Sequence, residues 1–499
     1  MGLVSKLNNN SNKSAMFLAF IFILFFLFLW FNKSINSYFS QDDFFHLRLI
    51  MDKDITDIPW FFTNYLEGQT FYRPVSRETF NLIMYKFFGL NPLPFHIFNV
   101  LLISSIGLLL FMFIKKLSKN PVFAYFTLII YLSSSVHSIE LYYLASVQTL
   151  MATIFLMLSL GFYFRFLEKK LLSYYLSSIL FFLISLFCHE SVIILPGIMI
   201  LINLLFTKDK NIRNYCLVVP IIALALLYLL SIGNSLSLPK QQVYQPVFQP
   251  KSILNTLSWF VLWSFGLPEM MVDFVRPKLL LKEEFKIWYG YYANIVFPML
   301  IFTFSSLLVL IVLLKKIILK DKFLFFFVAS FLICISPFLF FPQHKFVYYL
   351  SLPVVWFSAA VGLILAVSWK NRNFYKAFSV ILPLTFIIIS YQTINLNSTT
   401  YWAAKRAQAA QVLLDQFILK YPSAQKGSIF YILDDPSYPN IAKEWGTSSQ
   451  QAFYILSGSD AVRLLYNDAS IKVYYQSMEN LPVDIDSNKV KKVMAKFPY

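Results

Sequence analysis

Two adjacent carboxylates, Asp42 and Asp43, begin a short polar run that also contains His46. In a helix, Asp42 and His46 would share one face because four residues separate them. That spacing suits a general base with an orienting partner, or two ligands of a divalent metal. An acidic pair beside an apolar segment is more commonly a solvated surface, so the chemistry depends on which other groups accompany this run.

Other ionisable residues stand where long apolar runs begin or end. Besides His46, these junction residues are His96, His137, Glu140, His189, Glu190, His344 and Lys345. Ionisable groups at membrane depth are costly, and they commonly mark functional sites. We therefore expect a polar site that lies against the membrane and faces outward.

The apolar runs between these junctions are long enough to cross a membrane. Of 499 residues, 58% are hydrophobic and only 13% are charged, whereas a soluble domain has about 25% charged residues. Spanning the hydrocarbon core takes about 20 apolar residues in a helix. The sequence predicts an all-α polytopic membrane protein with about eleven transmembrane helices and further helices in its outer loops. The expected spans lie near 15–34, 95–114, 121–137, 144–166, 172–188, 190–207, 214–233, 293–315, 323–341, 346–368 and 374–392.

Lys and Arg occupy alternate connections between these spans. The basic connections contain Lys115, Lys116 and Lys119; Arg165, Lys169 and Lys170; Lys208, Lys210 and Arg213; Lys315, Lys316, Lys320 and Lys322; and Lys370, Arg372 and Lys376. By the positive-inside rule, these basic connections and the N-terminus are expected to lie in the cytoplasm. The chain is expected to be a multi-pass protein of the inner membrane. The loops 35–94 and 234–292 and the tail 393–499 then face outward. The net charge of +17 reflects this bias, so no nucleic-acid partner is expected.

The tail differs in character from the apolar region, 1–392, that precedes it. It contains an amphipathic run over 400–420, β-like runs over 428–433 and 471–475, and a helical run near 448–456. This pattern predicts a small extracytoplasmic α/β domain over 393–499. Two apolar stretches of the outer loops, Arg77–Gly89 and 253–266, have helical spacing and are expected to lie in the membrane interface.

Several short motifs, taken in their order along the chain, resemble polytopic C-type glycosyltransferases (the GT-C fold). The resemblance is to the protein O-mannosyltransferases and the TPR-containing O-mannosyltransferases, and more distantly to the aminoarabinose transferases. It covers about 1–210 well and 335–370 loosely. The matching motifs are Asp42-Asp43, Tyr72-Arg73-Pro74-Val75, Phe88-Gly89-Leu90-Asn91-Pro92, His96-Ile97-Phe98-Asn99, Val136-His137-Ser138-Ile139-Glu140, His189-Glu190 and Gln343-His344-Lys345. The chain departs from the family at Ser138, His189 and His344.

The resemblance implies an inverting transfer of a hexose or pentose from a polyprenyl-phosphate donor to an acceptor at the outer face of the membrane. Asp42 or Asp43 would be the general base, and the sequence does not distinguish them. Arg73 and Lys345, with His344 behind them, would bind the donor phosphate. The residues expected to bind the acceptor or to support the site are His46, His137, Glu140, His189 and Glu190. The acidic pair permits a divalent metal, the resemblance does not demand one, and the acceptor (protein, lipid or glycan) is left unassigned.

Two other functions compete with this interpretation. A transporter or flippase of lipid-linked saccharides would have broken, Gly- and Pro-rich helices in two matching halves, and the chain has only 13 Gly and no evident inverted repeat. An envelope assembly protein would use its outer loops only to bind partners. That function would leave the ordered set of polar junction residues unexplained.

Overall fold

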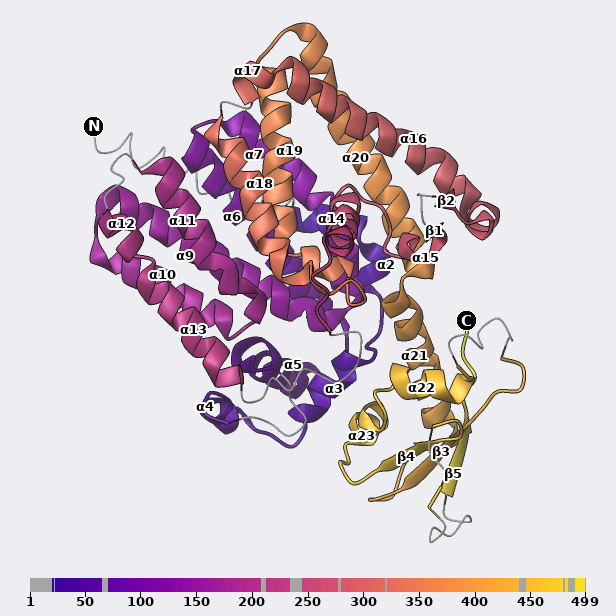
Figure 1. Ribbon diagram of the computed structural model, residues 1–499. Helices are drawn as coiled ribbons and strands as arrows, with labels where there is room; N and C mark the ends of the chain where they lie inside the picture. The colour runs from indigo at the N-terminus through magenta and orange to yellow at the C-terminus, as the bar shows by residue number, and fades with distance from the viewer. Residues whose placement is uncertain are drawn as a thin grey trace. The chain divides into compact units, whose positions relative to one another are not determined.

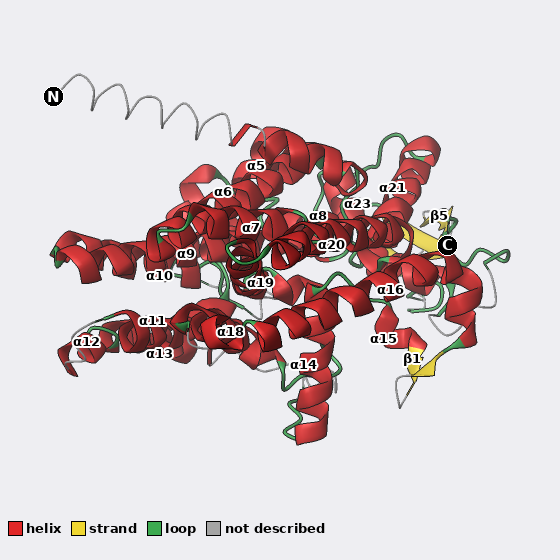
Figure 2. Cartoon of the chain, turned by 90° about the horizontal axis from the view of Figure 1, so that it is seen from above, coloured by secondary structure: helices red, strands yellow, loops and turns green. Residues whose placement is uncertain are grey.

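The computed structural model describes residues 20–64 except 22, 71–207, 212–233, 245–276, 280–318, 321–438, 446–478, 481–482 and 490–498. Residues 15–19 of the first expected span, and residues 65–70, 234–244 and 277–279 of the outer loops, lie outside this set. Most described residues are helical (Figure 2). The chain divides into a larger unit (1–32, 98–140 and 148–397) and a smaller unit (33–97, 141–147 and 398–499).

The larger unit consists almost entirely of helices (Figure 1), some of which begin or end in segments of the smaller one. Its helices are α6 (Leu93–Ser118), α7 (Pro121–Leu132), α8 (Val136–Tyr142), α9 (Val147–Lys169), α10 (Leu172–Leu186), α11 (Leu195–Phe206), α12 (Ile212–Cys216), α13 (Val219–Gly233), α14 (Pro250–Ser264), α15 (Met271–Phe274), α16 (Glu283–Leu313), α17 (Lys315–Ile318), α18 (Lys322–Ile335), α19 (Pro353–Trp369) and α20 (Asn373–Thr400). Short 3₁₀ turns are η4 (Glu190–Ile194), η7 (Ser336–Phe338) and η8 (Val347–Leu350), and a short hairpin pairs β1 (Val275–Arg276) with β2 (Leu280–Leu281).

Five of these helical segments are long and apolar enough to cross a membrane. They are Leu93–Ser118, Leu144–Lys169, Asn214–Ser231, Glu283–Leu313 and Asn373–Thr400. The pair α7 and α8, bent by 45°, makes a sixth if it is counted as one span. Only 22% and 28% of the apolar windows of Asn214–Ser231 and Glu283–Leu313 are buried. The chain therefore presents wide apolar surfaces, which suit contact with lipid.

The eleven expected spans are not all of that length. The apolar helices within Leu172–Leu186, Glu190–Phe206, Lys322–Phe338 and Pro353–Trp369 are shorter. Proline explains part of the difference, because it lacks the N–H that continues a helix and constrains the residue before it. Pro353 begins α19, so the expected span 346–368 loses its first turns to η8, and Pro337 lies in the 3₁₀ turn that follows α18.

Helix α19 is largely buried, and it packs against α7 and α18 (Figure 1). Trp356 is fully buried, with its ring centroid 5.6 Å from that of Phe326. A Cβ atom on Gly362 would lie only 2.4 Å from the hydroxyl of Thr127. Helices α19 and α7 can approach this closely because glycine has no side chain, as is common where membrane helices meet.

The smaller unit contains helices that flank the expected acidic pair and a three-stranded sheet. Its elements are α2 (Asn32–Ile35), α3 (Asp42–Leu49), η1 (Ile55–Asp57), α4 (Ile58–Phe61), the π-helical turn η2 (Pro74–Thr79), α5 (Phe80–Phe88), η3 (Leu144–Ser146), α21 (Trp402–Lys420), β3 (Ile429–Leu433), α22 (Ser448–Ile455), α23 (Asp460–Tyr466), β4 (Lys472–Tyr475) and β5 (Val490–Met494). The helix α5 ends at Gly89, whose φ of 55° a residue with a side chain rarely adopts.

The sheet of the smaller unit is parallel, in the order β4-β3-β5 (Figure 1). Ile429 of β3 pairs with Lys472 of β4 and with Val490 of β5. The strands β3 and β4 and the helices α21 and α22 match the elements expected in the tail. The strand β5 and the helix α23 were not expected, because the sequence Val490-Lys491-Lys492-Val493-Met494 carries two adjacent charges where an apolar run was sought.

Candidate functional site

Helix α3 begins at Asp42, and the two carboxylates at its start have different surroundings. Asp42 is exposed, whereas Asp43 is only 3% exposed. The backbone N–H groups of Ser40 and Ala145 donate to the two carboxylate oxygens of Asp43, over 3.0 and 2.8 Å. Asp43 thereby accepts a hydrogen bond from the backbone just before its own helix and links that helix to η3. One oxygen of Asp42 accepts a hydrogen bond from the hydroxyl of Tyr143.

The backbone just before Asp42 is held by the tail of the chain. Gln41 has φ 49° and ψ −116°, a conformation that costs energy in any residue with a side chain. Its N–H donates to the carbonyl of Ile455 over 2.9 Å. Seven residues after Gln41, Arg48 forms an ion pair of 3.2 Å with Asp460. These contacts hold the backbone at the start of α3 in one conformation and so fix the orientation of the Asp42 side chain.

Burial raises the pKa of Asp43 to about 8, and the two backbone N–H donors oppose that shift by favouring the charged form. At neutral pH, Asp43 therefore keeps its proton in much of the population. Asp43 also has both oxygens engaged by backbone groups. Exposure and the engagement of a single oxygen make Asp42 the carboxylate that can reach a solvent-side substrate.

Replacing Asp43 by Asn is expected to remove a pH dependence of stability. The pKa of Asp43 is raised in the folded chain, so its contribution to the free energy of unfolding is fully present below the pKa of about 4 that it has in the unfolded chain. That contribution is lost as the pH rises towards about 8. The Asn variant should start less stable by roughly 1–3 kcal/mol, because its amide faces a backbone donor. The deficit should shrink between pH 5 and pH 9 in thermal unfolding of the reconstituted protein. A deficit that stays constant across this range would contradict the assignment.

Two residues near Asp42 escaped the sequence analysis. Burial lowers the pKa of Arg406, which lies on α21, and the charge of Asp42 partly opposes that shift. The Tyr143 ring lies 5.3 Å from that of Trp402, and the Arg406 guanidinium lies 5.4 Å above the Trp402 ring. The i, i+4 spacing of Trp402 and Arg406 was visible in the sequence. It was overlooked because 393–499 was treated as a separate domain.

The predicted site residues His46 and Arg73 lie in the same unit. His46 is buried one turn after Asp42, and burial together with the charges of Arg77 and Arg73 lowers its pKa well below its ordinary value. His46 is therefore neutral at physiological pH. Arg73 precedes η2, with its guanidinium 4.8 Å from the ring centre of Phe71.

An ion pair between neighbouring residues, Arg77 and Glu78, was also missed. Both side chains are 4% exposed, and their charged atoms lie 2.7 Å apart. The adjacent opposite charges at the start of an apolar helix were the available signal. The pair places a fixed guanidinium beside His46, since the charge of Arg77 acts on that ring.

The remaining predicted residues belong to the larger unit. His137 and Glu140 form a pair of 2.8 Å, and both side chains are fully buried. The other ring nitrogen of His137 lies 2.8 Å from the carbonyl of Tyr131. His189 and Glu190 are 3.7 Å apart, and His189 accepts from the N–H of Ser191. The enclosed pair His137 and Glu140 suits support of the fold better than direct contact with an acceptor.

Lys345 and His344 lie together in the connection between α18 and α19. Lys345 donates to the carbonyl of Pro342 over 2.6 Å, and burial lowers its pKa while the charge of Asp273 raises it. Burial also lowers the pKa of His344 to about 4. His344 is therefore neutral at pH 7, and it could only donate a hydrogen bond to a phosphate. The carboxylate of Glu269, which sequence analysis missed, accepts from the N–H of Val347.

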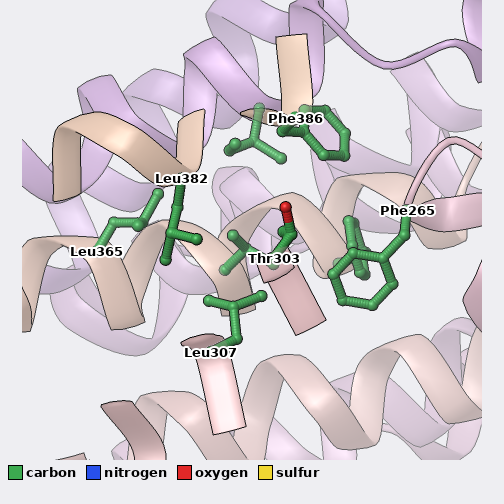
Figure 3. A pocket seen from close by; sticks show the side chains of 9 residues that line it. Phe265, Thr303, Leu307, Leu365, Leu382 and Phe386 are labelled. Carbon is green, nitrogen blue, oxygen red and sulfur yellow. The ribbon is translucent and has the colours of Figure 1, made fainter. Parts of the chain in front are cut away.

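Neither a metal cluster nor the apolar pocket identifies a further chemical centre. Within the described ranges, no group of three or more His, Cys, Asp or Glu side chains could hold a metal ion. A small pocket lies among helices of the larger unit (Figure 3), and its lining residues are apolar apart from Thr303. The lining consists of Ile130, Phe265, Thr303, Leu307, Phe357, Val361, Leu365, Leu382 and Phe386. None of the predicted site residues is among them.

The smaller unit therefore contains Asp42, Asp43, His46 and Arg73, together with Tyr143 and Arg406. His137, Glu140, His189, Glu190, His344 and Lys345 form three separate clusters of the larger unit. In comparisons with known proteins, no protein-family model matches the chain, and no curated protein matches it.

Proposed function

We propose that the chain is an inverting glycosyltransferase of the polytopic C-type class, with Asp42 as its general base. The observation that carries this proposal is the exposed Asp42 at the start of α3, held by Tyr143 and by the strained Gln41, in a unit that also contains Arg73. A carboxylate held in one orientation at the surface can take a proton from a hydroxyl that approaches from solvent.

In the proposed reaction, Asp42 accepts the proton of an acceptor hydroxyl as that oxygen forms a bond to the anomeric carbon of the donor. The bond between the anomeric carbon and the phosphate oxygen breaks on the opposite face of the sugar. Polyprenyl phosphate leaves with the electron pair. The configuration at the anomeric carbon is therefore inverted.

Charge that grows on the departing phosphate needs fixed cations. Arg73 is the proposed phosphate ligand within the unit of Asp42. Lys345 is proposed as a second cation for the same task, and His344, which is neutral at pH 7, as a hydrogen-bond donor to the phosphate. The eleven spans, with a cytoplasmic N-terminus and an outer tail, are part of this proposal, because a lipid-linked donor supplies sugar where nucleotide sugars are absent. A divalent cation would have Asp42 as its ligand from the acidic pair, because both oxygens of Asp43 accept from backbone N–H groups; its contribution would appear as a loss of transfer in EDTA.

The test is transfer by the full chain in phospholipid vesicles that contain radiolabelled polyprenyl-phosphate hexoses and pentoses. The proposal expects sugar to leave at least one donor in the presence of a cell-envelope extract as the source of acceptor. It is overturned if no donor is consumed and none binds.

A second candidate is a transporter of lipid-linked saccharides, and one observation favours it. The bent pair α7 and α8 breaks immediately before the enclosed His137 and Glu140, and transporters commonly place polar groups at broken helices. Movement of a labelled lipid-linked sugar between the leaflets of protein-containing vesicles, without transfer, would support this alternative.

Replacing Arg73 by Met is expected to lower kcat/KM for the polyprenyl-phosphate donor by about 10²-fold, the usual cost of removing one donor to a developing anion. Arg73→Lys should recover part of the loss, because it restores the charge without the planar fork. Lys86→Met is the control, since Lys86 pairs with Asp54 on an exposed surface. Equal rates for Arg73→Met and Lys86→Met would remove Arg73 from the phosphate site.

A further inference from the structure

Asp42 begins a chain of interactions that joins side chains from three other segments of the smaller unit. Tyr143 precedes η3, Trp402 and Arg406 lie on α21, and Tyr454 lies on α22. Contacts already described link them in sequence: the Tyr143 hydroxyl to Asp42, the Tyr143 ring to Trp402, and the Trp402 ring to Arg406. Tyr454, which is 41% exposed, acts electrostatically on Arg406. We call these five residues the Asp42 surface.

Arg406 is the informative member of this surface. Its side chain is half-buried, yet among the described residues no carboxylate lies within 4.0 Å of it and no acceptor makes a hydrogen bond to it. A guanidinium has five N–H groups in a planar fork and needs acceptors for them. The Trp402 face and the charge of Asp42 keep the guanidinium in place while leaving those donors for a ligand.

The position of Arg406 assigns it to the acceptor. In an inverting displacement, the base and the leaving group act on opposite faces of the reacting carbon. Arg406 is linked to the base through the contacts of Tyr143 and Trp402, and this places it with the groups on the side of the incoming hydroxyl. Arg73, whose field reaches His46 one helical turn beyond Asp42, is the alternative cation of this unit for the leaving phosphate.

The chemistry of the Asp42 surface matches a sugar ring better than a peptide. A pyranose has an apolar face of C–H groups and a rim of hydroxyls that both donate and accept. Aromatic rings can cover such a face with little loss of conformational freedom, while Arg406 donates to the rim and Asp42 accepts from it. A peptide acceptor is commonly held at the edge of a sheet through its backbone. Here the side chains come from the helices α3, α21 and α22 and from the turn before η3, with no strand among them.

We infer that the Asp42 surface binds the acceptor and that this acceptor is a saccharide. Only the role of the bound saccharide as the acceptor rests on the proposed function, because saccharide binding itself can be measured without any transfer. It gives α21, in the tail, a direct part in substrate recognition.

The test is saturation-transfer NMR on the full chain in phospholipid nanodiscs, so that no sugar-headed detergent competes. The probes are the methyl glycosides of glucose, galactose, mannose, rhamnose and N-acetylglucosamine, with a blocked Ala-Thr-Ala peptide for comparison. At least one glycoside is expected to bind, and Trp402→Leu is expected to weaken it at least tenfold. Trp402→Phe should retain most of the binding.

A matched control is available in the same unit. Trp60 is 39% exposed and has Lys53 positioned 4.7 Å from its ring centre, the same kind of pair as Trp402 and Arg406. Trp60→Leu is expected to bind the glycoside as the unchanged chain does. If Trp402→Leu does not fold, as judged by circular dichroism, Arg406→Gln replaces it and should weaken binding at least fivefold.

The outcomes separate this inference from the proposed function. Binding of the peptide and of no glycoside, or unchanged binding and transfer in the Trp402 and Arg406 variants, overturns the inference and leaves the transferase intact. Glycoside binding that needs Trp402, without transfer from any polyprenyl-phosphate sugar, supports the saccharide site and overturns the transferase.

Discussion

Replacing Asp42 by Asn is expected to lower kcat for sugar transfer by about 10²- to 10⁴-fold, the range that a positioned general base contributes. The amide has the same shape and can still accept the hydrogen bond from Tyr143. It cannot take a proton from the acceptor hydroxyl. The loss should therefore appear in kcat, with little change in the KM for the polyprenyl-phosphate donor.

The measurement is transfer from radiolabelled donor in vesicles, with thermal unfolding of each variant alongside. Asp52→Asn is the matched control, because Asp52 is an exposed carboxylate of the same unit and lies ten residues further along the chain. Asp43→Asn separates the two members of the acidic pair and should retain far more activity than Asp42→Asn. The reverse order would make Asp43 the base and would require its backbone contacts to open.

Replacing Arg77 by Met is expected to lower the free energy of unfolding by about 3–5 kcal/mol. Arg77 and Glu78 are almost fully enclosed, and the guanidinium also donates to the carbonyl of Phe71. Removing it leaves the Glu78 carboxylate without the charge that most strongly opposes the effect of burial on its pKa. Enclosed charges of this kind are costly once their partner is lost.

Chemical unfolding of the reconstituted chain measures this effect. Arg48→Met is the control for a more exposed pair, since the Arg48 side chain is 38% exposed and its bond with Asp460 should contribute about 1 kcal/mol or less. The double variant Arg77→Met/Glu78→Gln should recover part of the loss because it removes both charges. If Arg77→Met were no more destabilising than Arg48→Met, the pair would have no special role in holding η2.

The sequence was most informative where local spacing decides the structure. It correctly placed Asp42 and His46 four residues apart on one helix, and it located β3, β4, α21 and α22 within a few residues. It was less informative about helix length, because prolines such as Pro353 end or begin helices inside runs that are apolar throughout.

The difference between Asp42 and Asp43 could not be read from the sequence at all. Adjacent residues of one type look alike, and the two are distinguished by tertiary contacts, such as the bond from the backbone N–H of Ala145 to Asp43. The same limit hid Arg406, because no local pattern connects α21 with a carboxylate more than 360 positions earlier. Contacts of this kind depend on the fold as a whole.

The bond between Gln41 and Ile455 also sets an order of events during synthesis. The amide of Gln41 must wait for about 410 further residues before its acceptor exists, which at roughly 5–20 residues per second takes about 20–80 s. Until Ile455 has been synthesised, this hydrogen bond cannot stabilise the strained conformation of the peptide before Asp42. A chain that stops before Ile455 would therefore carry Asp42 without the contact that holds the backbone before it.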